Sequence, residues 1–320
     1  MKELSQIDLV FCVDLTASMQ PFIEAARRHV VTILAGLRSA AAADLRVAIV
    51  GYRDHDGPDL EGESPVEVHP FLVEDPDIHR TLSGLSVGSR STNTDAAEAV
   101  FAGLDACIRR LPFRPRAFRI IVLIGDAPPH ACGADGAPHP DRFPTTDPSG
   151  WTLSELAKGL EGAGLFLYAL GMIPSNFPVH DPILEKAFHR LATSTGGTYQ
   201  AAPTPEAAIA VVEAVGRRVF GQLAIDRRVY EQLVAQAALE DRQIDRLFAR
   251  AHAMPAAPAM APCAASPMAS QAFAAPSRSA AGAAPRPAPV PPEASAAASV
   301  SEDEVKASLE RLRKRGLLEE

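Results

Sequence analysis

The stretch FCVDLTASMQPF, residues 11–22, decides the fold, because the end of a buried strand and the start of a helix meet within it. Its apolar run stops at Asp14, hydroxyl side chains follow at Thr16 and Ser18, and helix-like sequence begins near Pro21. Residues two apart in an extended loop point the same way, so these three side chains can face one point. Two interpretations stay open: a partial oxygen shell for a hard cation, or a set of caps for the following helix.

Strand-like and helix-like stretches alternate from this point to about residue 220. Short, continuous apolar runs are typical of parallel strands buried on both faces, and they occur at residues 7–13, 45–52, 119–125 and 165–171. Residues 66–72 contain a proline and favour an edge strand, and residues 197–203 form a weaker last strand. Helices are expected between them, near residues 21–37, 94–110, 152–163, 182–195 and 204–220. The alternation predicts a doubly wound α/β fold, with a mostly parallel six-stranded sheet and helices on both faces.

The chain divides by composition into four parts. Residues 1–220 form the α/β domain, and residues 221–253 form a helical extension. Residues 254–300 are rich in alanine and proline and have almost no charge, which predicts a disordered linker because too little apolar surface can be buried. Residues 301–320 return to amphipathic helix sequence, with a capping box at the start. A helix this short is marginal alone in water, so we expect it to pack against its own chain or another.

Composition and charge argue against several classes of function. The net charge of −8 disfavours a nucleic-acid-binding surface, which needs clustered lysine and arginine. No stretch is long and apolar enough to cross a membrane, and the start MKELSQIDLVF does not resemble a secretory signal. The four cysteines have no disulfide-framework spacing. We therefore expect a cytoplasmic protein with free thiols, no nucleic-acid partner and no membrane contact.

Two further loops carry oxygen-bearing side chains at strand ends. Asp126 follows the run at residues 119–125, and Thr92 and Thr94 lie in the loop GSRSTNTD just before a helix. In a doubly wound sheet, binding sites form at the carboxyl ends of the strands. Together with Asp14 in the first loop, these residues predict one rim at which three loops meet.

This combination resembles the von Willebrand factor A domain, whose metal-ion-dependent adhesion site uses D-x-S-x-S, a loop threonine and a later aspartate. The first motif stands here as D-L-T-A-S, in which a threonine replaces the first serine and keeps its hydroxyl. The resemblance covers residues 7–220. It implies a metal site made of Asp14, Thr16, Ser18, Thr92 and Asp126, with Thr94 as the alternative to Thr92.

Three other segments are similar to the von Willebrand A domains found beside atypical alpha-kinases and in related bacterial proteins. They are VGYRDHD, GDAPPH and DRFPTTDPSGWTLSEL. Residues after Phe220 lack the length, the strands and the glycine-rich nucleotide loop of a kinase domain, so we expect no kinase activity. What the resemblance implies is the domain and its metal site.

The resemblance also implies how the site would act. The expected ion is Mg²⁺, which prefers six oxygen ligands, with Mn²⁺ and Ca²⁺ as alternatives. In the family, an acidic side chain of a partner protein completes the metal shell, so the function implied is a non-enzymatic interaction module. In bacteria, such domains often resemble adaptors for AAA+ ATPases or components of signalling and defence systems. The C-terminal helix can recruit a second partner.

The alternative function is a Mg²⁺-dependent phosphatase or hydrolase that uses Asp14. Aspartyl-phosphate enzymes on similar sheets usually carry a second acid two residues after the nucleophile. Thr16 occupies that position here, and no lysine is evident at a later strand end. A purely structural scaffold is a third interpretation.

The rim around the metal is expected to contact the partner through Arg53, Asp54, His55 and His130. An ordinary surface turn with ion pairs is the alternative for the first three. The insertion at residues 127–150 is long enough to be a recognition loop. Its possible zinc ligands match no trusted spacing, so we favour a flexible or proline-stiffened loop; they are His130, Cys132, His139 and Asp141.

Overall fold

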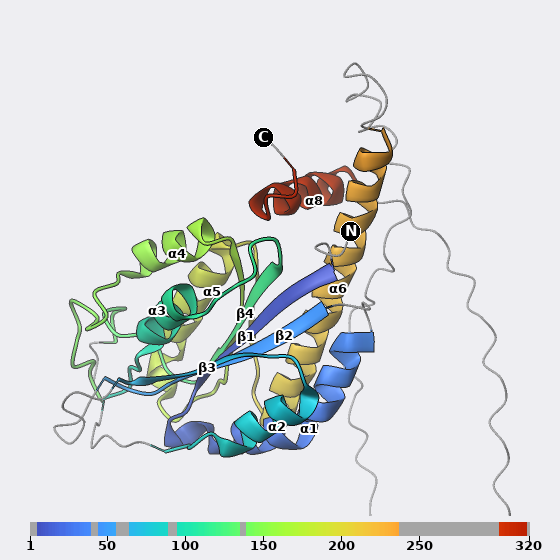
Figure 1. Ribbon diagram of the computed structural model, residues 1–320. Helices are drawn as coiled ribbons and strands as arrows, with labels where there is room; N and C mark the ends of the chain where they lie inside the picture. The colour runs from blue at the N-terminus through green and yellow to red at the C-terminus, as the bar shows by residue number, and fades with distance from the viewer. Residues whose placement is uncertain are drawn as a thin grey trace, which may run out of the picture.

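A six-stranded sheet in the order β3-β2-β1-β4-β5-β6 forms the centre of the protein (Figure 1). It is seen in a computed structural model, which describes residues 5–39, 44–55, 64–88, 95–134, 139–236 and 301–318. The strands are β1 (Gln6–Asp14), β2 (Asp44–Tyr52), β3 (Val66–Leu72), β4 (Phe118–Gly125), β5 (Leu165–Gly171) and β6 (Tyr199–Ala201). All neighbouring strands are parallel except β2 and β3 at one edge. The predicted doubly wound α/β fold and its edge strand are confirmed.

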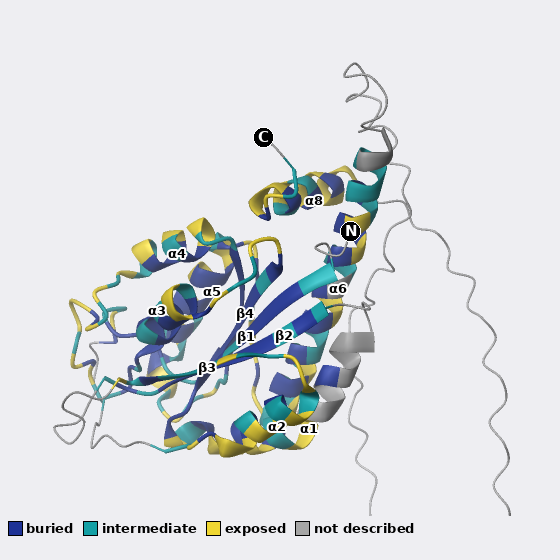
Figure 2. Cartoon of the chain, in the orientation of Figure 1, coloured by how far each residue is buried: buried dark blue, intermediate teal, exposed yellow. Residues whose placement is uncertain are grey.

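Helices cover both faces of the sheet. Figure 1 shows α1, α2 and α6 on one face and α3, α4 and α5 on the other. The helices are η2 (Ala17–Met19), α1 (Gln20–Ser39), α2 (Asp75–Gly84), α3 (Val100–Arg110), α4 (Leu153–Gly162), η4 (Pro178–His180), α5 (Asp181–Ser194), α6 (Pro205–Gln236) and α8 (Glu302–Lys314). Figure 2 shows the strands mostly buried and the exposed residues on the outer faces of the helices.

The central strand β1 is apolar from Leu9 to Val13, between the buried acids Asp8 and Asp14. Leu9 and Val13 pack into the core beneath α1 and α6, while Val10 and Cys12 pack into the core beneath α3 and α4. Because successive side chains of a strand point to opposite faces, a strand covered on both sides needs apolar residues throughout. The polar residue Asp14 comes only where the strand ends.

Three helical segments differ from the expectation. Helix α2 was not predicted, although Pro76 lies in its first turn and Ile78 and Leu82 are buried one turn apart. Helix α3 begins only at Val100, because residues 95–99 form a loop that bridges to the chain after β4. Helix α6 continues without a break past residue 220, since Leu223 enters the same core as the earlier part of the helix. The rest of the expected extension, the predicted linker at 254–300 and residues 319–320 lie outside the described residues.

Helix α8 packs on the second half of α6 (Figure 1). Ile225 and Val229 of α6 form a small buried apolar cluster with residues of α8. Asp226, completely buried, accepts hydrogen bonds from Arg311, the shortest at 2.6 Å. The first turn of α8 carries the capping box between Ser301 and Glu304. The C-terminal helix therefore finds its packing partner within its own chain.

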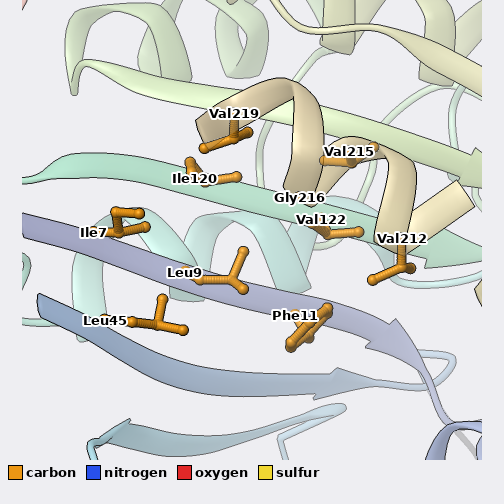
Figure 3. Close-up of a pocket in the computed structure, with 10 residues that line it drawn as sticks. All are labelled: Ile7, Leu9, Phe11, Leu45, Ile120, Val122, Val212, Val215, Gly216 and Val219. Carbon is orange, nitrogen blue, oxygen red and sulfur yellow. The ribbon is translucent and has the colours of Figure 1, made fainter. Parts of the chain in front are cut away.

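Small voids separate α6 from the sheet, and they are purely apolar. One of about 20 Å³ lies beneath the middle of α6, between Leu9, Ile120 and Val215 (Figure 3). Another, of about 40 Å³, lies further along between Val13, Ile23 and Ile124. A bound water needs two or more polar partners, and these walls supply none, so the voids are packing gaps. The polar groups that can do chemistry lie elsewhere, at the carboxyl rim of the sheet.

Within the described residues, no helix combines the length and the apolar character that crossing a membrane requires.

Candidate functional site

The first loop gathers its three oxygen-bearing side chains at the carboxyl end of β1. Asp14 is completely buried, and its Oδ1 accepts hydrogen bonds from the Thr16 amide at 2.7 Å and from the Thr16 hydroxyl at 2.6 Å. The Thr16 hydroxyl also lies 3.1 Å from the Ser18 hydroxyl. Thr16 precedes η2, yet its side chain caps no backbone amide of that helix. The interpretation of this loop as a simple helix cap is therefore not supported.

The same loop is connected to Asp126, which follows β4. Strands β1 and β4 are parallel neighbours, so their carboxyl ends lie side by side. The Ser18 hydroxyl donates a hydrogen bond to Asp126 Oδ1 at 3.1 Å. Polar contacts of 3.1 Å or less thus connect Asp14 through Thr16 and Ser18 to Asp126. Two of the three expected loops meet as the sequence suggested. The third, with Thr92 and Thr94, lies outside the described residues.

One oxygen of Asp14 has no partner. Asp14 Oδ2 is buried and makes no hydrogen bond to any described residue. It lies over Gly125, where an added Cβ would sit 3.6 Å from Oδ2 and would overlap the Tyr52 hydroxyl. Burial, together with the charge of Asp126, raises the pKa of Asp14 to about 8. A buried carboxylate with an unused oxygen is costly unless a proton or a cation neutralises it.

Nothing cationic in the described part of the chain pairs with this carboxylate. The charges that raise the pKa of Asp14 belong to Asp126 and Asp54, which are acids. Burial also raises the pKa of Asp126, while its hydrogen bond from Ser18 lowers it. Ser18 and Asp126 are half-buried, so the group opens to the surface on their side. Two carboxylates and two hydroxyls that share one small region fit a hard divalent cation, which prefers oxygen ligands.

A further acid, Glu98, belongs to the same rim and was missed in the sequence. Its Oε2 is buried without a hydrogen-bond partner. Burial raises the pKa of Glu98 well above its ordinary value, and the charges of Asp14, Asp54 and Asp126 raise it further. The sequence predicted a helix over residues 94–110. In such a helix Glu98 would lie near the first turn, where acids are common, and it would not be singled out as a site residue. The available signal was its place just before a helix, in a segment that leads from the threonine loop to the carboxyl rim.

A second cluster beside these acids is organised around His130. Its Nδ1 lies 2.7 Å from Asp141 Oδ1, and its Nε2 lies 2.7 Å from Asp54 Oδ1. Burial alone would lower the pKa of His130, but the hydrogen bonds to Asp141 and Asp54 raise it to about 9. Ligand-type atoms of Asp54, Asp95 and His130 lie within 4.8 Å of one another. Because both ring nitrogens are already engaged, the imidazolium itself supplies the positive charge of this cluster.

The four insertion residues considered for zinc do not come together in one site. His130 and Asp141 bind each other, whereas the ring of His139 packs 4.5 Å from that of Phe177. Burial raises the pKa of the Cys132 thiol to about 12, which disfavours the thiolate that zinc needs. In the described part of the insertion, Asp141 also accepts hydrogen bonds from the amides of Ala131 and Phe143, both at 2.8 Å.

The residues expected to form the partner-facing rim are mostly tied down. Asp54 is 6% exposed and His130 0%, and their side chains hydrogen-bond each other at 2.7 Å. Arg53 donates hydrogen bonds to Glu67 at 3.3 Å and to the Ser86 carbonyl at 2.6 Å. His55 lies 3.5 Å from Asp147 of the insertion. Arg53 and His55 are therefore held by contacts to other loops. Ser18 and Asp126 are half-buried and partly reach the surface.

The sequence is similar to part of a known kinase. The alpha-protein kinase vwkA of Dictyostelium discoideum is 29% identical over 151 residues, which cover 47% of this chain and 23% of that protein. The chain thus matches less than a quarter of the length of that relative. No protein-family model matches the chain.

Solved structures share the fold. The pilus adhesin SpaC from Lactobacillus rhamnosus GG has a TM-score of 0.50 and 18% identity, covering 68% of this chain and 31% of the adhesin. The von Willebrand factor type A structure from Catenulispora acidiphila has a TM-score of 0.46 and 14% identity, covering 68% of this chain and 43% of its own. The expected resemblance to von Willebrand A domain proteins is confirmed, and the sequence is also similar to part of an alpha-protein kinase.

Proposed function

We propose that this chain is a metal-dependent protein-interaction module that offers a divalent cation at the carboxyl rim to an acidic side chain of a partner protein. The observation that carries the proposal is the unpartnered Oδ2 of the fully buried Asp14. It belongs to a residue connected by polar contacts through Thr16 and Ser18 to a second carboxylate. A bound cation would stabilise a carboxylate held in this way, and the described residues offer it none.

The residues that would hold the ion come from three loops. Asp14, Thr16 and Ser18 supply the first, Asp126 the second, and Thr92 or Thr94 the third. Mg²⁺ suits a set of carboxylate and hydroxyl oxygens, with Mn²⁺ and Ca²⁺ as alternatives. When bound, the ion supplies a positive charge that a partner carboxylate can reach from the open side near Ser18. The amide and hydroxyl of Thr16 hold the buried carboxylate of Asp14 in position.

The partner is proposed to be a protein, and the class implied by the resemblance is an AAA+ ATPase or a signalling or defence component. The compartment proposed is the cytoplasm, which is compatible with Cys12, Cys107 and Cys132 being free thiols. A second partner for α8 would have to compete with α6, because the apolar side of α8 already packs there. Its outer side is polar and exposed.

Phosphotransfer by Asp14 is the weaker function. A nucleophile must be reached by the substrate, and Asp14 is completely buried beneath Thr16. Aspartyl-phosphate enzymes on similar sheets usually carry an acid two residues after the nucleophile, where this chain has Thr16. Hydrolysis of p-nitrophenyl phosphate in the presence of Mg²⁺ that is lost in Asp14→Asn would favour the enzyme. We expect the wild type to show no such hydrolysis.

Calorimetry on the full chain tests the proposal. Titration with Mg²⁺, Mn²⁺ and Ca²⁺ should show binding in the wild type, no binding in Asp14→Asn, and unchanged binding in the exposed control Glu161→Gln. Proteins crosslinked to the wild type in cells should be lost with EDTA and with Asp14→Asn alike. Wild-type behaviour of Asp14→Asn in the metal titrations would overturn the proposal.

A further inference from the structure

We propose that the second half of α6 carries a helix-binding face for an amphipathic helix of a partner protein, and that α8 occupies this face as an autoinhibitory substitute (Figure 1). The helix-binding face consists of Ile225, Asp226 and Val229. It lies away from the carboxyl rim, because Arg315 at the end of α8 donates from Nε to the carbonyl of Arg116, just before β4 begins. The inference is therefore independent of the proposed metal site.

The first support is that α8 belongs to neither of the cores that enclose the sheet. Among the described residues, those two cores contain none from α8. Val305 and Leu312 of α8 instead form a separate small cluster with Ile225 and Val229 of α6. Segments with few buried apolar contacts open at a lower free energy than the core of a domain. Helix α8 can therefore leave α6 while both cores stay closed.

The second support is a buried acid that selects an arginine. Asp226 is completely buried, and its Oδ1 accepts hydrogen bonds from Arg311 Nε at 3.0 Å and from Arg311 Nη2 at 2.6 Å. The planar guanidinium offers a carboxylate several fixed donors, which a lysine cannot reproduce. A helix without the arginine would leave Asp226 buried and unpaired, which is strongly unfavourable. The helix-binding face therefore recognises an apolar helix that carries an arginine.

The third support is an imperfect fit of α8 itself. Ser308 is completely buried, and its hydroxyl has no hydrogen-bond partner among the described residues. It lies one turn from Val305 and one turn from Leu312, so it belongs to the side of α8 that packs on α6. A buried hydroxyl without a partner weakens docking, because it loses its water and gains no bond in exchange. A helix without this hydroxyl would bind the same face more tightly.

The partner helix is thus defined by its chemistry. It carries an arginine where α8 has Arg311 and a small apolar residue where α8 has Ser308. Its other apolar residues stand where α8 has Val305, Leu309 and Leu312.

The covalent connection makes α8 a threshold for this partner. Helices α6 and α8 belong to one chain and are separated in the sequence by residues 237–300. A tethered segment acts at a high effective concentration, so it excludes helices that bind the face only weakly. A helix that fits better than α8 exceeds the threshold and displaces it.

Fluorescence anisotropy with labelled peptides of residues 301–318 tests the inference on the full chain. Arg311→Glu in the chain places a second acid against Asp226 and should release α8. The wild-type peptide should bind this variant at least about tenfold more tightly than it binds the wild-type chain, in which α8 competes. A peptide with Arg311→Glu should bind neither chain, and should bind a chain with Asp226→Arg instead.

A second peptide isolates the buried hydroxyl. It carries Ala307→Ser together with Ser308→Ala, which moves the hydroxyl to an exposed position and leaves the composition and the summed helix propensity unchanged. This peptide should bind the Arg311→Glu chain at least about fivefold more tightly than the wild-type peptide does. Added to the wild-type chain, it should displace α8 and raise amide hydrogen exchange at residues 302–314.

The outcomes decide each part of the inference. Equal affinity of the wild-type peptide for the wild-type and Arg311→Glu chains would overturn it, because α8 would then cover no helix-binding face. Equal affinity of the two peptides would overturn the role of α8 as a poorer substitute. Arg311→Gln, a milder change, should give the same order of affinities, and the melting temperature shows that each variant is folded. Neither EDTA nor Asp14→Asn should change any of these affinities, so failure of the metal site is told apart from failure of this face.

Discussion

Asp8 and Asp14 lie towards opposite ends of strand β1 and both are completely buried, but only Asp8 is neutralised by arginines. Arg46 donates to its two oxygens at 3.0 and 2.7 Å, and Arg114 donates from its backbone and side chain at 2.7 and 2.8 Å. Asp14 has hydroxyl and amide donors on one oxygen and nothing on the other. Arginines neutralise Asp8, whereas Asp14 meets no cation among the described residues.

Replacing Asp14 by asparagine should stabilise the protein without metal. Burial and Asp126 raise the pKa of Asp14 to about 8, so the folded state binds a proton more tightly than the unfolded state. The stability from this group is therefore lost as pH rises from about 4 towards 8. Metal-free Asp14→Asn should melt at least about 2 °C higher than wild type at pH 8, with little difference at pH 4. Differential scanning calorimetry in EDTA measures this, and a lower melting temperature at pH 8 would contradict it.

Replacing Asp8 by asparagine should lower the free energy of unfolding and leave cation binding unchanged. The variant leaves Arg46 and Arg114 without their shared carboxylate, and breaking a buried pair costs about 3–5 kcal/mol. Urea denaturation should show this loss. Cation binding by the folded variant should remain at the wild-type level, since Asp8 lies at the far end of β1 from the metal rim. Weakened binding in the folded variant would show that the two ends are coupled.

The contrast explains what the sequence could predict. The motif around Asp14 and the apolar runs predict which residues lie at the carboxyl rim of the sheet, because hydrophobic periodicity and strand ends are local features of the chain. The partners of Asp8 are 38 and 106 residues away, and no local pattern indicates them. The burial of His130 was missed for the same reason: its two acids come from different loops. Glu98 was missed because the helix was expected to start too early.

His130 should make stability depend on alkaline pH. Its pKa is raised to about 9 by Asp141 and Asp54 against the effect of burial, so its contribution is fully present below about pH 6.5 and is lost as pH rises through 9. The difference in unfolding free energy between wild type and His130→Asn should shrink between pH 7 and pH 10. Urea denaturation at both values tests this. A constant difference would mean that His130 is neutral in the folded protein.

Helix α8 should leave α6 when its buried ion pair is broken. Arg311→Gln would leave Asp226 buried without its partner, and breaking such a buried pair costs about 3–5 kcal/mol for as long as α8 covers Asp226. Amide hydrogen exchange at residues 302–314 should rise by at least about tenfold, since each 1.4 kcal/mol is a factor of ten. Lys306→Ala removes only an exposed pair with Glu302 and should leave exchange unchanged. Continued protection in Arg311→Gln would show that apolar packing alone holds the helix.

Gly125 should be required for the shape of the carboxyl rim. It ends β4 beneath Asp14 Oδ2, and the Cβ of an alanine there would overlap the Tyr52 hydroxyl. Gly125→Ala should therefore lower both the melting temperature and the affinity for Mn²⁺, because Tyr52 or Asp14 must move. Adding Tyr52→Phe removes the overlapping oxygen and should restore part of both. Gly84→Ala, at the end of α2 with no atom within 4 Å of the new methyl group, is the matched control. If the double variant binds metal no better than Gly125→Ala, the displaced group is Asp14 itself, and if Gly125→Ala binds as wild type does, the close approach has no bearing on the site.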